Sequence, residues 1–512
     1  MERARGWFSV TSAIATLALV VRIMPDALEG SVPALRVAWS NVLGINLLFK
    51  MDELGWLFSL IAAFIGFLTI LFSVKDLEGE RDLGTYYMWM LVFIGSMIGL
   101  ASSHDFISFF IFWELVSLCS WGLISFWKER PASVRASMKA LLMTHLSSLP
   151  LLMAIIALYL EAGSFSMGSI AEKVAAKGAS PSIVFASAMF IVAVVAKSAQ
   201  VPLHTWLPDA MEAPTPVSAL LHSATMVKAG VLLAARMLTV FTPLFIVGSS
   251  LHLFFASLGV LSMMVAIHMA LVEKDLKRIL AYSTISHIGF MMLGIGVGTA
   301  LGLVGGLFHL LNHAMFKAAL FLCAGSVIFR VGTRNVDEMG GLAKKMPITA
   351  ASFLIAAFSA SGVPPLSGFA SKLMIYEAAL TAEGPYHAVY TVYTFLAVYV
   401  SAVTLAVFMK AAYAIFFGQA SPRSNEVKDS PPSMLLPIVV LAAASVLFGV
   451  FPQIPVGYLI QPALKAAGQA AAQLTVTWLG YVTAIGSYQA ALIGLLLALS
   501  FILGGAIYIG GV

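Results

Sequence analysis

The sequence predicts an all-α polytopic membrane protein with about 14 transmembrane helices and two inverted five-helix repeats, each containing a broken helix. Of its 512 residues, 60% are apolar and only 10% are charged, whereas soluble domains carry about 25% charged residues. The apolar residues form runs of roughly 17 to 30, long enough to cross a bilayer. Two of these runs are interrupted by prolines in mid-span, as in membrane proteins built from inverted repeats.

The apolar runs define the expected helices. These cover residues 7–24, 55–74, 85–102, 105–126, 138–160, 182–198, 214–239, 244–270, 276–298, 302–330, 347–378, 388–417, 433–452 and 482–511. The first run lacks a small-residue cleavage site, so we expect a retained helix and not a signal peptide. Residues 32–53 are too irregular for a helix and predict a short external hairpin.

The chain is expected to form one membrane domain in four segments. These are the N-terminal helices and hairpin (1–104), a first repeat (105–270), a second repeat (276–417) and C-terminal helices (418–512). Most lysines and arginines of the connectors lie in the even-numbered ones. By the positive-inside rule, those connectors and both termini face the cytoplasm.

Composition also excludes several kinds of site. The net charge of +5 is dispersed over the connectors, so no nucleic-acid partner is indicated. Cys119 and Cys323 are far apart in sequence, which argues against a disulfide, an iron–sulfur cluster or a zinc site. No pair of histidines is singled out as haem ligands. We therefore expect neither a metal nor a cofactor in this chain.

Several predicted spans contain an ionisable residue, which costs at least about 2.5 kcal/mol in the hydrocarbon layer. Glu114 is flanked by apolar residues for a full turn on each side, so it must be protonated or paired with a cation from another helix. Lys197, Lys228 and Lys372 lie in or beside other spans. For a lysine near a helix end, such as Lys197, reaching toward the surface is an equally good explanation.

A second group of ionisable residues forms a stripe. His309, His313 and Lys317 are spaced four residues apart and so stack along one helix face. His287 lies in the preceding predicted helix. Together they predict a polar path through the membrane, although a helix histidine is often only a hydrogen-bonded structural group.

The interruptions point to ion movement, because free backbone groups at broken helices bind ions near the midplane. The residues that stop the two helices are Pro202, Pro208, Pro364 and Pro365. Near the first break, oxygen or nitrogen ligands for an ion could come from Asp209, Glu212, Thr215 and His222.

Four features carry a resemblance to a known family. They are Glu114, the motif VPLHTWLPDAMEAPTPVSALLHSATMVKAG at 201–230, DLKRILAYSTISHIG at 275–289 and HLLNHAMFKAALFL at 309–322. With them the chain resembles the antiporter-like subunits shared by the respiratory complex I membrane arm, Mrp-type sodium/proton antiporters and membrane-bound hydrogenases. The resemblance spans about residues 30–455, and Lys372 leans it toward Mrp D-type and hydrogenase H-type subunits.

The resemblance implies roles for individual residues. Glu114 would pair with Lys197, Lys228 would be the central lysine, and Lys372 would be the terminal group. Between the last two, the relay would run through His287, His309, His313 and Lys317. Separating the ion pair would then start proton transfer along the relay, because an ion pair and desolvation act oppositely on both groups.

The resemblance also implies an assembly. The chain would be a non-redox, ion-translocating subunit, for H⁺ or Na⁺/H⁺, of an energy-coupling complex in a prokaryotic plasma membrane. Its partners would be homologous antiporter-like subunits, small hydrophobic subunits and a peripheral redox module that holds any iron–sulfur or nickel–iron centres. A stand-alone Mrp-type antiporter is the main alternative. A single-chain carrier of small solutes and a purely structural membrane anchor are further ones.

Overall fold

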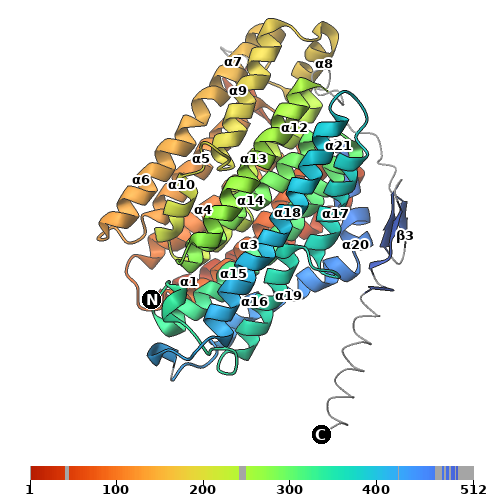
Figure 1. The fold of residues 1–512 in the computed structure, drawn as a ribbon. Helices are drawn as coiled ribbons and strands as arrows, with labels where there is room; N and C mark the ends of the chain where they lie inside the picture. Colours follow the sequence, from red (N-terminus) through yellow and green to blue (C-terminus); the bar gives the residue numbers. More distant parts are fainter. Residues whose placement is uncertain are drawn as a thin grey trace.

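The computed structural model describes residues 2–40, 45–241, 249–424, 426–466, 475–477, 480–483, 486–490 and 492–493. Its long helices pack side by side along one common direction (Figure 1). Within the described residues, 11 helices are long and apolar enough to cross a membrane, and the helices over 181–197 and 347–361 are shorter apolar ones. The polytopic all-α class is therefore confirmed, while the count of 14 and the segment boundaries stay predictions.

The N-terminal region contains the expected hairpin. Its elements are α1 (Glu2–Arg22), α2 (Met24–Glu29), β1 (Leu35–Ser40), β2 (Ile45–Phe49), α3 (Glu53–Asp76) and α4 (Leu83–Ser102). The two strands pair antiparallel, with Arg36 opposite Leu48. Helix α3 begins where the Asp52 side chain accepts a hydrogen bond from the Gly55 N–H, which satisfies a donor that the first helical turn leaves free.

The next block holds the first broken helix. It comprises α5 (Phe106–Ile124), α6 (Pro131–Leu146), α7 (Ser148–Ala162), α8 (Met167–Lys177), α9 (Pro181–Lys197), α10 (Trp206–Asp209), η1 (Ala210–Glu212), α11 (Thr215–Ser223) and α12 (Met226–Val240). The break expected after Lys197 is present at 198–205. Pro202 lies in it, whereas Pro208 lies within the single turn of α10.

A further interruption was not expected from the sequence. The run predicted as one helix over 214–239 is two helices, α11 and α12, separated at Ala224 and Thr225. Thr225 leaves the helical region with φ −125° and ψ −95°, and its hydroxyl donates to the Leu220 carbonyl at 3.0 Å. No proline or glycine marks this site, so helix-breaking residues alone do not reveal it.

The following block holds the second broken helix. It comprises α13 (Ser250–Val272), α14 (Leu276–Gly296), α15 (Ala300–Val331), η2 (Val336–Glu338), α16 (Pro347–Ser361), α17 (Ser367–Leu380), α18 (His387–Ala412) and η3 (Tyr413–Phe417). Gly362 ends α16 with φ +84°, a left-handed conformation that glycine adopts without a side-chain clash. Pro364 and Pro365 follow before α17, so this predicted break is confirmed.

The C-terminal region departs from expectation. Its elements are η4 (Pro422–Ser424), α19 (Pro432–Val450), α20 (Gln453–Pro455), η5 (Val456–Ile460), α21 (Gln461–Ala466), β3 (Thr475–Thr477), β4 (Gly480–Val482) and β5 (Ser487–Tyr488). The prediction of a helix from residue 482 is wrong at its start, because β4 pairs with β5 there. Residues 494–512, the rest of that predicted helix, lie outside the described residues.

Burial separates inner from outer helices. The spans over 215–238 and 276–296 are completely buried, and 83% of the α15 span is buried. By contrast, only 39% of the span formed by α6 and α7 and 33% of the α18 span are buried. The polar stripe of the sequence therefore lies on two inner helices of the bundle, α14 and α15.

Candidate functional site

A row of cations and imidazoles lies at the centre of the bundle. Its members are Lys197, Lys228, His287, His309, His313, Lys317 and Lys372, and none is more than 1% exposed. Charged side chains are almost never buried to this degree unless they are paired or functional. Each of these predicted residues therefore lies in the interior, and the contacts of each define the site.

Lys197 is the last residue of α9, beside the first break. Its Nζ donates to the Trp113 carbonyl at 2.9 Å and to the Ser117 hydroxyl at 2.6 Å. The ammonium also lies 4.7 Å from the centroid of the Trp113 ring, within the range of a cation–π interaction. Lys197 is thus held by α5, the helix that carries Glu114.

The direct Glu114–Lys197 ion pair is not formed. Among the ion pairs of the described residues, Glu114 instead meets His145 of α6, with Nδ1 and Oε2 2.7 Å apart. Trp113 and Ser117 lie four residues apart on the face of α5 toward Lys197, and Glu114 is turned about 100° away from Trp113. The Glu114 side chain is 25% exposed and borders an apolar pocket of about 480 Å³ between α5 and α6. His145 is not among the residues predicted from the sequence.

Lys228 lies in the first turn of α12, directly after the unexpected interruption. Its Nζ donates to the Leu310 carbonyl of α15 at 2.8 Å. Leu310 is the neighbour of His309, so the central lysine is joined through a backbone carbonyl to the helix that carries the histidine stripe. A carbonyl oxygen compensates the buried ammonium only in part, because it lacks a full negative charge.

The three histidines form one cluster between α14 and α15. His287 Nδ1 lies 3.1 Å from His309 Nε2, and His309 Nδ1 lies 3.0 Å from the Ser371 hydroxyl of α17. The rings of His287 and His313 are 5.5 Å apart. Among the described residues, His287 Nε2 and both His313 nitrogens have no hydrogen-bond partner. The cluster therefore has both a hydrogen-bonded connection toward the second break and open positions for proton exchange.

Lys317 continues the stripe on α15, one turn beyond His313. Its Nζ donates to the Leu280 carbonyl at 3.1 Å and contacts the Ser283 hydroxyl. Both partners belong to α14, the helix that also carries His287. One face of α14 therefore contacts the stripe at two levels.

Lys372 lies at the second break. Its Nζ donates to the Ala360 and Ser361 carbonyls at 2.9 and 3.3 Å, the terminal carbonyls of α16, where the helix dipole is negative. It also donates to the Ser401 hydroxyl of α18 at 2.9 Å, which lies 2.6 Å from the Tyr376 hydroxyl. The interrupted helix thus supplies the acceptors that stabilise this lysine.

The expected ion ligands near the first break do not converge. Asp209 pairs with Lys139 at 2.6 Å and Glu212 with Arg334 at 2.8 Å, so both carboxylates are already matched by cations. His222 stacks on Phe321, with ring centroids 5.3 Å apart. Thr215, 8% exposed, packs near Gly325. In the part of the chain that the structure describes, no group of three or more His, Cys, Asp or Glu residues is placed to hold a metal ion.

Two buried cations outside the predicted set were missed. Lys277, 2% exposed, donates to the Ala213 carbonyl at 2.5 Å, and Arg236 is 5% exposed. In the sequence Lys277 lies in a polar connector, where an exposed lysine is expected and nothing indicates burial. Arg236 follows Lys228 by two helical turns in an otherwise apolar run, and that periodicity was the available signal.

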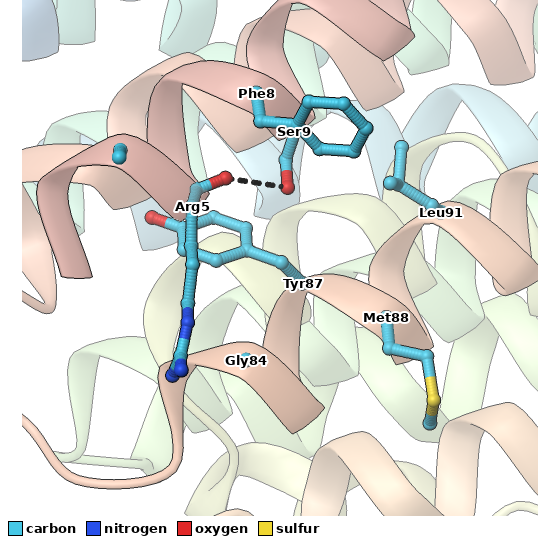
Figure 2. Close-up of a pocket in the computed structure, with 8 residues that line it drawn as sticks. Arg5, Phe8, Ser9, Gly84, Tyr87, Met88 and Leu91 are labelled. Carbon is cyan, nitrogen blue, oxygen red and sulfur yellow. Dashed lines mark hydrogen bonds between the residues drawn. The ribbon is translucent and has the colours of Figure 1, made fainter. Parts of the chain in front are cut away.

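A peripheral pocket of about 510 Å³ lies between α1 and α4. Figure 2 shows Arg5, Phe8, Tyr87 and Met88 around it, with the Ser9 hydroxyl donating to the Arg5 carbonyl at 2.9 Å. None of the residues that line it belongs to the buried row. The pocket is therefore separate from the candidate site.

The fold agrees with comparisons to known proteins. The model of the family described as NADH:quinone oxidoreductase/Mrp antiporter, transmembrane, matches residues 103–397. The chain therefore belongs to this family, and the resemblance noted in the sequence is confirmed. The Na(+)/H(+) antiporter subunit A1 of Staphylococcus aureus is 37% identical over 480 residues, which are 90% of this chain and 59% of that protein.

Solved structures extend the likeness over the whole fold. A chain of the membrane-bound sulfane sulfur reductase, an archaeal respiratory membrane complex, matches 99% of this chain and 83% of its own length at a TM-score of 0.88 and 27% identity. A chain of the Mrp complex from Dietzia sp. DQ12-45-1b matches 97% of this chain and 55% of its own length at 0.79 and 28%. The chain thus spans about six tenths of the length of the curated relatives it matches, which are A subunits and not the expected D type.

Proposed function

We propose that this chain is an ion-translocating subunit of a multisubunit membrane complex and that protons move along its buried row. The observation that carries the proposal is the row itself: four lysines and three histidines, none more than 1% exposed. No carboxylate of the described residues forms an ion pair with any of the seven. A carboxylate partner would favour the charged form of these lysines, whereas burial disfavours it.

The contacts suggest an order for the path. Lys197 lies at the first break and Lys228 lies against the helix of the histidines. From His309 the path continues through Ser371 to its neighbour Lys372. The half-helix carbonyls around Lys372 support a role as terminal group, since broken helices commonly form such sites near the midplane. Glu114 and His145 act on this path from the outer side of α5.

As the parent machine we propose an energy-coupling respiratory complex, with an Mrp-type antiporter as the alternative. The higher TM-score to the archaeal respiratory complex favours the first, and the A1 subunits support the second. Mass spectrometry of the intact complex, purified from native membranes through this chain, separates the two. Iron–sulfur or nickel–iron subunits in the complex support a redox-driven pump, whereas small hydrophobic subunits alone support the antiporter.

Transport is tested in inverted membrane vesicles that contain the whole complex. Lys228→Ala removes the central cation and should abolish the pH gradient that the complex forms, while the amount of assembled complex stays unchanged. Lys177→Gln is the matched control, because Lys177 is a 48% exposed surface lysine. A normal pH gradient in Lys228→Ala would refute a proton path through this lysine. Parallel measurement of sodium uptake decides whether Na⁺ is exchanged.

A further inference from the structure

A buried charge cluster outside the proton path lies at the far end of α12. The Arg236 guanidinium forms a bidentate ion pair with the Asp52 carboxylate. Nη2 donates to Oδ1 at 2.8 Å, and Nη1 donates to Oδ2. Nη2 also donates to the Ala101 carbonyl at 3.2 Å. The two side chains are only 6% and 10% exposed. A bidentate pair fixes the relative orientation of the two side chains as well as the distance between them.

Asp52 is itself held firmly. It caps α3 through the Gly55 N–H at 2.8 Å, and its Oδ2 lies 3.2 Å from His104 Nε2. The His104 backbone N–H donates to the Leu48 carbonyl of the hairpin at 2.8 Å. Burial by itself raises the pKa of Asp52, but Arg236 and His104 hold that pKa well below its usual range. The carboxylate is therefore charged at neutral pH and tied to three other segments.

Helix α12 is interrupted at the end opposite Arg236. The break at Ala224 and Thr225 separates it from α11, so no continuous helix fixes its first turn. Lys228 and Arg236 lie eight residues apart and so share one face, about 12 Å apart along the axis at 1.5 Å per residue. Moving the Arg236 end would move the lysine with it, because the fifteen residues Met226–Val240 form one continuous helix.

We propose that Asp52 and Arg236 are a positioning pair that anchors α12 and thereby holds Lys228 against the Leu310 carbonyl. Its consequence for transport rests on the proposed function, whereas the mechanical role does not. The pair ties the helix that carries the central lysine to the hairpin and to α3. The hydrogen-bond partners described for Arg236, which are Asp52 and Ala101, are not members of the buried row.

The mechanical role is tested by the accessibility of position 228. In the assembled complex, Cys119 and Cys323 are replaced by Ala and Lys228→Cys is introduced, and the rate of modification by N-ethylmaleimide is measured. Because breaking a buried pair strongly destabilises it, adding Arg236→Gln or Asp52→Asn should raise that rate by about ten-fold or more. Combining the two should add little, since both remove the same contact. Lys177→Gln, which breaks the exposed pair with Glu161, is the matched control.

The conservative variant Arg236→Lys keeps the positive charge but loses the bidentate hydrogen bonds of the guanidinium. We therefore expect a rate of modification at position 228 between those of the unmodified pair and Arg236→Gln. Arg236→Lys also carries the test if Arg236→Gln fails to assemble. An unchanged rate in every Arg236 and Asp52 variant that assembles would overturn the anchor.

A second readout uses the intact lysine. With Lys228 present, Arg236→Gln should shift the pH profile of transport by about half a unit or more, because Lys228 then lies in altered surroundings. A variant with wild-type pH profile and wild-type accessibility contradicts the inference. If the unmodified complex transports no ion at all, the proposed function fails. The accessibility of position 228 still tests whether the Asp52–Arg236 pair anchors α12.

Discussion

At the scale of single residues, the buried lysines are stabilised by partial charges and not by carboxylates. Lys228 meets the Leu310 carbonyl, and Lys372 meets two carbonyls at the end of α16. A full ion pair in the interior would hold the proton tightly, since removing either partner then leaves an uncompensated charge. Carbonyl and hydroxyl acceptors stabilise each ammonium without a full opposing charge, which suits a residue that passes protons on.

The Ser401 hydroxyl, which accepts a hydrogen bond from Lys372, provides a test of this role. Ser401→Ala removes one hydrogen-bond acceptor of Lys372 and the hydroxyl that connects Lys372 to Tyr376. A lost hydrogen bond to a charged group is worth about 1.5–3 kcal/mol. We expect the transport rate to fall by about ten-fold in inverted vesicles. Ser257→Ala is the control, because Ser257 forms the same kind of bond to Tyr393 at 2.7 Å. Equal rates for the two variants would show that Ser401 has no special role.

Asp52 gives a prediction about pH. Because the pKa of Asp52 is lowered in the folded chain, its contribution to stability is fully present above the usual aspartate range and is lost only as pH falls below about 4. In a His104→Gln background, Asp52→Asn should therefore lower the thermal midpoint of the complex by the same amount at pH 5, 6.5 and 8. A destabilisation that changes across this window would mean that Asp52 titrates within it.

At the scale of elements, function depends on where helices stop. The prolines at both predicted breaks are visible in the sequence, and their effect on a helix is local. The interruption before Lys228 lies at Thr225, whose backbone is not helical although neither proline nor glycine stands at this position. Gly362 shows a third case, because it ends α16 in a left-handed conformation right against Lys372.

Gly362 is tested by a matched pair of glycines. A Cβ at Gly362, φ +84°, would lie 3.1 Å from Cδ of Lys372, whereas one at Gly332, φ +77°, would meet no atom within 4 Å. Both alanine variants carry the same backbone strain of about 1 kcal/mol, so similar losses of thermal stability are expected. Only Gly362→Ala should also reduce proton transport, measured in inverted vesicles. A transport defect of equal size in Gly332→Ala would assign the effect to strain alone.

At the scale of the whole molecule, the inner helices are buried on all sides, whereas the outer helices are largely exposed at the surface of the bundle. The α14 span is completely buried, while the span of α6 and α7 is only 39% buried. His145, 60% exposed on this outer surface, pairs with Glu114, and a polar pair facing hydrocarbon is costly. This surface is where we expect the neighbouring membrane subunits to pack.

Orientation is a prediction of the whole chain, because it follows from the distribution of basic residues over all connectors. Lys177 is assigned to the outer side and Lys128 to the cytoplasmic side, and both side chains are exposed, at 48% and 63%. With Cys119 and Cys323 replaced, a membrane-impermeant maleimide on intact cells should label Lys177→Cys and not Lys128→Cys. Permeabilised cells, in which both should react, are the control. The reverse pattern would invert the topology.

The sequence by itself determined the membrane class, the hairpin, both proline breaks and the seven residues of the buried row. These follow from local physics, because hydrocarbon penalises charge wherever it occurs and proline stops a helix wherever it stands. Tertiary structure decided which partner each side chain meets. Glu114 turns to His145 and not to Lys197, Lys228 meets a carbonyl of α15, and Arg236 meets Asp52, 184 residues away. The angle of a side chain around its helix selects a partner only once the neighbouring helices are in place, and residues so far apart in sequence are brought together by packing alone.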